Sequence, residues 1–134
     1  MTAERTGTQP GDQPAGGRLV RACALADLAE DGVRRAELPD GTAVVVVRTG
    51  GRVHALADRC SHADFRLSAG EVFDGGLECP LHGASFDLTT GQPDGPPATR
   101  PVPVHAVRVD GDDVLVDAAP APGPVDGAPV PPGP

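Results

Sequence analysis

Two short segments of this sequence each combine one cysteine with one histidine. Cys60 and His62 form Cys-Ser-His, and Cys79 and His82 lie in Cys-Pro-Leu-His-Gly. Thiolate sulfur and imidazole nitrogen are ligands for zinc and for iron–sulfur clusters. Residues 63–78 separate the two halves, and a glycine or proline stands in or near each. Two such loops can hold one inorganic centre from two sides.

The order of the four residues bears on the identity of the centre. Structural zinc sites usually pair cysteine with cysteine and histidine with histidine, with about two to five residues inside each pair. Here each half mixes the two types, as Cys-x-His and Cys-x-x-His. In a Rieske cluster two cysteines hold one iron and two histidines hold the other. The mixed halves therefore favour a cluster, and a zinc-stapled interaction module is the alternative.

The same residues resemble the binding signature of the Rieske iron–sulfur family. The similarity runs from Cys60-Ser-His62 through Cys79-Pro-Leu-His-Gly83 and continues over residues 84–91 and 96–103, so that it covers about residues 18–118. The resemblance implies a [2Fe–2S] cluster whose metal ligands are Cys60, His62, Cys79 and His82. It also implies an all-β fold, an antiparallel β-sandwich with a small two-loop cluster-binding subdomain at its tip.

The pattern around these segments is rich in β-strand signals. A β-branched run over Thr42–Thr49 predicts a buried central strand, and Gly50-Gly51 predicts a two-residue hairpin turn. Further strands are expected at Leu19–Ala24, Val33–Leu38, Arg52–Ala57, Val102–Val109 and Asp113–Asp117, with one helical turn at Ala26–Glu30. Short strands separated by turns indicate an antiparallel sandwich or barrel. Residues 58–100 are less regular and poor in apolar side chains, so that a bound metal is expected to help hold them.

Composition divides the chain into three parts. Residues 1–17 are polar and residues 119–134 are dominated by Pro, Ala and Gly, so that both are expected to be disordered. Residues 18–118 then form one Rieske domain. Removing either tail is expected to leave the cluster intact.

Charge and hydropathy exclude several classes of partner. The formal net charge is -8, which argues against nucleic acid and against anionic membranes. Neither a membrane span nor a signal peptide is recognisable, which predicts a cytoplasmic protein. An odd number of cysteines, 3, favours metal ligation over a disulfide framework in a reducing compartment. An acidic surface suits transient docking with a basic partner, although it also serves solubility alone.

The second loop carries information about the reduction potential. Replacing two cysteines by two neutral histidines removes negative charge and raises the potential to about -150 to +300 mV. High-potential members of the family resemble Cys-Pro-Cys-His-Gly-Ser-x-Tyr in this loop. Here Leu81 replaces the middle cysteine, Phe65 stands where that cysteine's disulfide partner would be, and Ala84 and Phe86 lack the two hydroxyl groups. Because hydrogen bonds to sulfur stabilise the reduced state, we expect a potential near the low end, about -150 mV.

Other chemically capable residues are given simpler roles. Cys23 is expected to be a buried core thiol, and His54 and His105 are expected to pack within strands or face solvent. Carboxylates close to the ligands in sequence are either solvated loop charges or guides for a basic partner: Asp58, Asp64, Glu71, Asp74 and Glu78.

The predicted function is electron transfer. A saturated cluster binds no substrate, so that the chain is expected to be an electron-transfer component of an oxygenase-type system and not an enzyme. The resemblance implies a ferredoxin between a flavin-dependent reductase and a terminal non-haem iron oxygenase that hydroxylates aromatic or related compounds. Two alternatives use the same residues: an accessory Rieske protein working with iron–sulfur assembly proteins, and the small subunit of a nitrite reductase.

Overall fold

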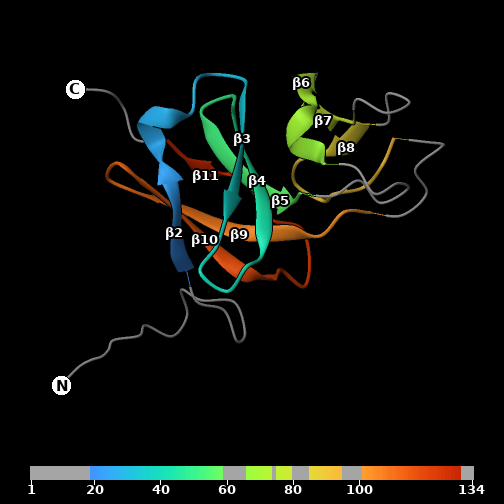
Figure 1. Cartoon of the computed structure of the whole chain (residues 1–134). Helices are drawn as coiled ribbons and strands as arrows, with labels where there is room; N and C mark the ends of the chain where they lie inside the picture. The colour runs from blue at the N-terminus through green and yellow to red at the C-terminus, as the bar shows by residue number, and fades with distance from the viewer. Residues whose placement is uncertain (1–18, 59–65, 74, 80–84, 95–100, 131–134) are drawn as a thin grey trace.

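The computed structural model describes residues 19–58, 66–73, 75–79, 85–94 and 101–130 (Figure 1). The predicted ligands Cys60, His62 and His82 lie outside these residues, as do the proposed disordered residues 1–17. The described parts form two antiparallel sheets, one large and one small.

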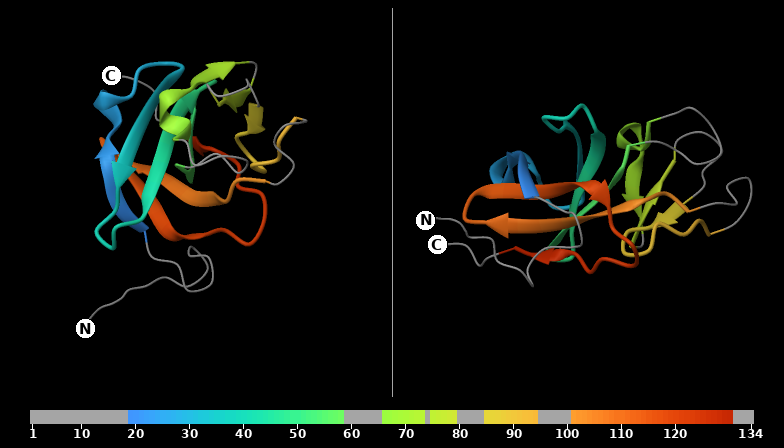
Figure 2. Two further views of the ribbon diagram at one scale, coloured as in Figure 1. Left: turned by 45° about the vertical axis from the view of Figure 1, so that its right-hand side comes forward. Right: turned by 90° about the horizontal axis from the view of Figure 1, so that it is seen from below.

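The large sheet is curled and contains seven strands. Its order is β2-β10-β9-β5-β4-β3, and β11 adds to β5. All of its pairs are antiparallel, and the outer strands β2 and β3 approach each other, so that the sheet nearly closes on itself (Figures 1 and 2). The strands are β2 (Leu19–Ala24), β3 (Gly32–Glu37), β4 (Ala43–Thr49), β5 (Arg52–Ala57), β9 (Val104–Asp110), β10 (Asp113–Pro120) and β11 (Ala128–Pro129). Every strand predicted from the sequence is therefore present, and each of its ends lies within three residues of the predicted one.

The β4–β5 hairpin has the turn that its sequence predicts. Thr49 pairs with Arg52, so that Gly50 and Gly51 alone form the loop. Both glycines have positive φ, 63° and 77°. Residues with a side chain rarely adopt a positive φ, whereas glycine does so readily. Two-residue hairpin turns need positive φ because their backbone twist then matches that of the flanking strands. The turn thereby fixes the register of β4 against β5.

The four valines of β4 are buried on both faces of the strand. Val45 and Val47 belong to one apolar cluster, and Val44 and Val46 belong to another. All four are fully buried. Successive side chains of a strand point to opposite faces, so that a strand with a core on each side needs a continuous apolar run. The run predicted as a buried central strand is therefore confirmed.

Cys23 lies in the second of these clusters, with 5% of its surface exposed. Burial raises the pKa of this thiol. The prediction of a core cysteine is confirmed.

A small three-stranded sheet lies beside the large one and was not predicted. It consists of β6 (Glu71–Phe73), β7 (Gly76–Glu78) and β8 (Ser85–Asp87), in that order. The 3₁₀-helix η3 (Leu67–Ala69) precedes it. Strands of three residues give too short a pattern to detect in sequence. Figure 2 shows this sheet as a separate layer at one end of the large sheet.

Helical structure is minor in the described parts of the chain. The helical turn expected at Ala26–Glu30 is the 3₁₀-helix η2 (Leu25–Asp27). Across the described ranges, no helix has the length and apolar character needed to cross a membrane.

Most of the tail expected to be disordered is folded. Residues 119 and 120 complete β10, and β11 pairs with Val53 and Arg52 of β5. Gly127 lies against the His54 ring, and a Cβ at this position would overlap that ring. The prediction of disorder was therefore wrong for residues 119–130, because tertiary packing on β5 supplies burial that composition does not reveal.

We expect a chain that ends at Ala118 to lose about 2–4 kcal/mol of its free energy of unfolding. The deletion removes backbone hydrogen bonds from Ala121 to Val104, from Val125 to Thr89 and from Val130 to Gly51, together with the buried Ala128. Urea denaturation followed by circular dichroism measures the change. A chain that ends at Val130 is the control, and equal stability of the two truncated chains would contradict the role assigned to β11.

Candidate metal centre

Cys79 is the one predicted ligand that the structure describes. It directly follows β7 and is completely buried. Its neighbours in the first apolar cluster include Leu77 and Phe86 of the small sheet and Leu56 and Val104 of the large sheet. The sulfur-bearing residue therefore lies where the two sheets meet, in a place that excludes water.

The chain that follows the first predicted ligand segment contacts the chain that precedes the second. Segment 59–65 is followed by η3 and Gly70, and segment 80–84 is preceded by Glu78 and Cys79. Gly70 lies directly against the backbone of Glu78, and a Cβ on Gly70 would overlap the Glu78 carbonyl oxygen. The chain flanking the first cysteine–histidine half therefore touches the chain flanking the second.

The far side of the second segment is fastened by backbone and side-chain hydrogen bonds. Glu78 of β7 pairs with Ser85 of β8 across the segment. Asp94 N donates to the Ser85 carbonyl oxygen at 2.9 Å, and Ser85 N donates to Asp94 Oδ1 at 3.2 Å. These bonds fix Glu78 and Ser85, which flank the second segment, relative to each other and to Asp94.

Gly91 connects the small sheet to the large one. Its N–H donates to the Asp87 carbonyl oxygen, and its own carbonyl oxygen accepts from Val102 N at 2.8 Å. Its φ is 76°, and a Cβ would overlap the Val102 carbonyl oxygen. Both the conformation and the space therefore require glycine at this position.

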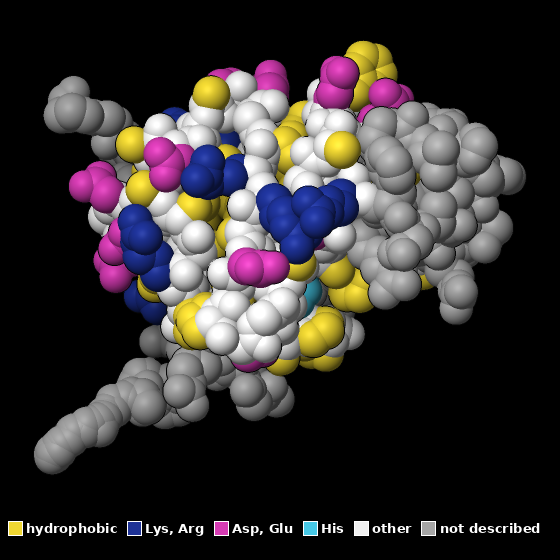
Figure 3. All heavy atoms as spheres, in the orientation of Figure 1, with side chains coloured by type: hydrophobic (Ala, Val, Ile, Leu, Met, Phe, Trp, Pro, Cys, Tyr) yellow, Lys and Arg dark blue, Asp and Glu magenta, His cyan; other side chains and the backbone are white. Residues whose placement is uncertain are grey.

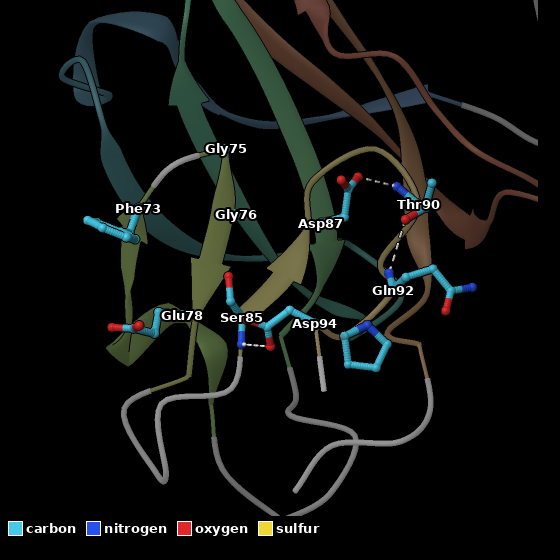
Figure 4. Close-up of a pocket in the computed structure, with 10 residues that line it drawn as sticks. Phe73, Gly75, Gly76, Glu78, Ser85, Asp87, Thr90, Gln92 and Asp94 are labelled. Carbon is cyan, nitrogen blue, oxygen red and sulfur yellow. Dashed lines mark hydrogen bonds between the residues drawn. The ribbon is translucent and has the colours of Figure 1, made fainter. Parts of the chain in front are cut away.

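A groove of about 500 Å³ runs along β7 and β8 (Figure 4). Its walls carry the carboxylates of Glu78, Asp87 and Asp94, and its rim carries Phe73. Asp87 Oδ1 accepts from the N–H groups of Thr89 and Thr90, so that this carboxylate shapes the β8 turn. The described residues that line the groove include three carboxylates and no Lys or Arg, so that this part of its wall is acidic.

Phe73 is the exposed large apolar side chain of the described residues, with 68% of its surface accessible. On the face seen in Figure 3, carboxylates flank exposed apolar atoms at the tip of the small sheet, whereas Arg side chains and carboxylates are interspersed over the large sheet. The small sheet thus offers an acidic surface with an aromatic side chain.

The two histidines outside the predicted ligand set are buried in the large sheet. His105 Nδ1 lies 2.7 Å from the Asp117 carbonyl oxygen. Burial lowers the pKa of His54, whose Nδ1 has no partner within the described residues. These positions confirm the packing role expected for both.

Asp58 was expected to be a solvated or partner-guiding charge, and that expectation was wrong. Its side chain is completely buried and accepts hydrogen bonds from Ser68 and Arg35. Because Arg35 and Ser68 lie 23 and 10 residues away in the chain, no local sequence pattern signals this network. Asp64 and Asp74 lie outside the described residues.

The residues present fit a [2Fe–2S] cluster. Across the described ranges, no three His, Cys, Asp or Glu side chains come together as a metal site, since three predicted ligands lie in segments outside them. The two segments nevertheless leave adjoining points of the fold, and together they supply two thiols and two imidazoles, the donor set of this cluster. Cys79 provides one of the thiols in a buried setting.

Comparison with known proteins defines the class. The model of the Rieske [2Fe-2S] domain matches residues 18–111. The chain belongs to this family, whose members carry a [2Fe–2S] cluster, and the resemblance and all-β fold inferred from sequence are confirmed.

Individual relatives indicate a narrower group within this family. The chain is 40% identical over 99 residues to the ferredoxin component of biphenyl 2,3-dioxygenase from Rhodococcus jostii (strain RHA1), covering 74% of this chain and 92% of the relative. The ferredoxin of carbazole 1,9a-dioxygenase from Nocardioides aromaticivorans IC177 is similar in structure, with a TM-score of 0.69, 38% identity and coverage of 73% and 95%. A chain from the complex of reduced oxygenase and oxidised ferredoxin in carbazole 1,9a-dioxygenase has a TM-score of 0.71 and 31% identity, with coverage of 76% and 94%.

We expect Gly91→Ala to destabilise the protein by about 2–4 kcal/mol, because it combines an unfavourable φ with a backbone overlap. Thermal unfolding measured by circular dichroism tests this. Gly123→Ala is the matched control, since nothing lies within 4 Å of a Cβ there. Equal losses from the two substitutions would show that the contact with Val102 is unimportant.

Proposed function

We propose that this protein is the ferredoxin component of a multicomponent oxygenase. It receives single electrons from a flavin-dependent reductase and passes them to a terminal non-haem iron oxygenase. The single observation that carries the proposal is the similarity, over nearly the whole length of the relatives, to ferredoxin components of dioxygenases. A related chain is part of a complex of oxygenase and ferredoxin, which supports a terminal oxygenase as partner.

The proposed ligands are Cys60 and Cys79 for one iron and His62 and His82 for the other. When bound, the [2Fe–2S] cluster takes up and releases one electron without binding a substrate. The position of Cys79 is compatible with this assignment, because it directly precedes segment 80–84 and lies at the contact between the two sheets. The protein's own contribution is to hold the ligand segments and to exclude water on the Cys79 side.

The charge of the surface favours a basic docking face on the partner. The net charge is -8, and Glu78 and Asp94 lie in the groove near the second ligand segment. Complementary charge raises the rate of encounter between proteins that form short-lived complexes.

Because a flavin-dependent reductase supplies the electrons in this scheme, we place the protein in the cytoplasm.

Reduction with dithionite followed by low-temperature electron paramagnetic resonance tests the proposal. We expect a rhombic signal with the low average g value that mixed cysteine and histidine ligation produces. Colourless, zinc-containing protein with no signal would refute it. The reduced protein should then transfer its electron to an oxygenase of the relatives' type. Transfer only to proteins of iron–sulfur assembly, or to a nitrite reductase, would favour the alternatives instead.

Cys79→Ser should abolish the visible absorption of the cluster, because serine is a poor ligand for these irons. Cys23→Ser is the matched control, since both cysteines are buried but Cys23 lies in the other apolar cluster. We expect the control to keep its full iron and sulfide content by chemical analysis. Retention of the cluster in Cys79→Ser would remove Cys79 from the ligand set.

The midpoint potential should lie near the low end of the Rieske range, about -150 mV. Phe86 is fully buried in the same apolar cluster as Cys79 and carries no hydroxyl group for a hydrogen bond to sulfur. Spectroelectrochemical titration measures the potential, with Phe86→Tyr as the comparison. A wild-type value above about +100 mV would contradict the prediction.

A further inference from the structure

The two ligand segments are closed in different ways. The second is bracketed by β7 and β8, whose residues Glu78 and Ser85 pair directly. The first leaves β5 after Ala57 and re-enters regular structure at Leu67 in η3. Among the described residues, no strand pairing joins Ala57 to Leu67. Some other interaction must hold the ends of the first segment together.

The Asp58 side chain provides that connection. Its Oδ1 accepts from Ser68 N at 2.7 Å, and its Oδ2 accepts from Ser68 Oγ at 2.7 Å. Asp58 and Ser68 stand immediately outside the segment 59–67, so that these two bonds close it into a loop. The Asp58 backbone N–H also donates to the Ala43 carbonyl oxygen, which attaches the Asp58 main chain to β4.

Arg35 completes the network from a third element. Its Nη1 donates to Asp58 Oδ2 at 2.9 Å from strand β3. The Asp58 side chain is completely buried, and the Arg35 side chain is 30% exposed. A buried carboxylate is stable only when it is paired and hydrogen-bonded, and here two partners from distant parts of the chain meet that need.

We propose that Asp58 is a positioning residue for the cluster, which ties the first ligand segment shut and, together with Arg35, balances the charge beside it. The proposal rests on the proposed ligands Cys60 and His62. Two peptide units separate Asp58 from Cys60, so that their Cα atoms lie within about 7 Å. A carboxylate anchored at so short a chain distance from the proposed ligand would influence both the position of that cysteine and the local potential.

The charge balance has a distinctive consequence. A negative charge near the cluster disfavours electron uptake, and a positive charge favours it. Because Asp58 and Arg35 pair, their effects largely cancel in the intact protein. Removing one charge exposes the other, so that the two removals shift the midpoint potential in opposite directions. A purely structural role for the pair would not produce opposite signs.

The experiment compares four single variants of the full chain by redox titration and electron paramagnetic resonance. We expect Asp58→Asn to raise the midpoint potential and Arg35→Gln to lower it, with the double variant returning towards the wild-type value. Asp113→Asn and Arg21→Gln are matched controls. They disrupt an exposed Arg–Asp pair, joined at 2.7 Å, beside the β9–β10 turn at the opposite end of the molecule (Figure 1), and should leave the potential unchanged.

A further variant separates tethering from charge. Ser68→Ala removes one bond of the closure but keeps the Asp58–Arg35 pair. We expect it to lose iron to a chelator several-fold faster than wild type, with a nearly unchanged potential. If Asp58→Asn fails to fold, Ser68→Ala and Arg35→Gln still test both parts of the proposal.

The outcomes are distinct. Shifts of equal sign for Asp58→Asn and Arg35→Gln, or shifts no larger than those of the controls, would overturn the charge balance. Wild-type loss rates in Ser68→Ala would overturn the tether. Wild-type protein without a Rieske signal would refute the proposed function and, with it, the inference. A wild-type signal with unaltered variants would refute the inference alone.

Discussion

Packing of the small sheet against the large one is the interaction on which the candidate site depends. Leu67, Leu77 and Phe86 are fully buried and share one apolar cluster with Val45 and Leu56 of the large sheet. Three strands of three residues each cannot bury enough surface to be stable alone. The large sheet supplies the missing burial and so gives the ligand segments a fixed base. Cys79 lies within that contact. The apolar side chains that join the two sheets therefore also surround one of the predicted metal ligands.

Hydrogen bonds hold parts of the chain that apolar packing does not position. The first apolar cluster positions η3 and β7, but it does not determine the path of the chain between β5 and η3. Asp58 connects those ends, Asp94 and Ser85 fasten the exit of the second segment, and Gly91 joins β8 to the start of β9. The Asp58 and Ser85 connections flank the two predicted ligand segments, and Gly91 links the small sheet to the large one.

Two surfaces of different character result. The large sheet has buried valines on both faces of β4 and carries mixed charges on the exterior seen in Figure 3. The small sheet has an acidic groove and the exposed Phe73. For a carrier of single electrons, a partner must approach the bound cluster, and we have proposed that the ligands flank the small sheet. The acidic character of that end is consistent with fast, reversible association with a basic surface.

Most of the large sheet could be predicted because its signals are local. The valine run of β4 and the glycine pair after it specify a doubly buried strand and a two-residue turn, each from neighbouring residues. The small sheet could not be predicted, since its strands are too short for a period-two pattern. The tail was misjudged because Ala128 and Gly127 fit against β5 and His54, contacts that composition does not encode.

The sequence by itself determined the class of site. Two cysteines and two histidines in mixed pairs predict a Rieske cluster, because ligand chemistry depends on residue type and order, and the match to the Rieske [2Fe-2S] domain confirms the family. The tertiary structure alone decided which residues support the site. Asp58 stands near Cys60 in sequence and reads as an ordinary loop charge, yet it is buried between Ser68 and Arg35. Whether a carboxylate is solvated or paired depends on which distant elements pack against it, and that is settled only when the chain folds.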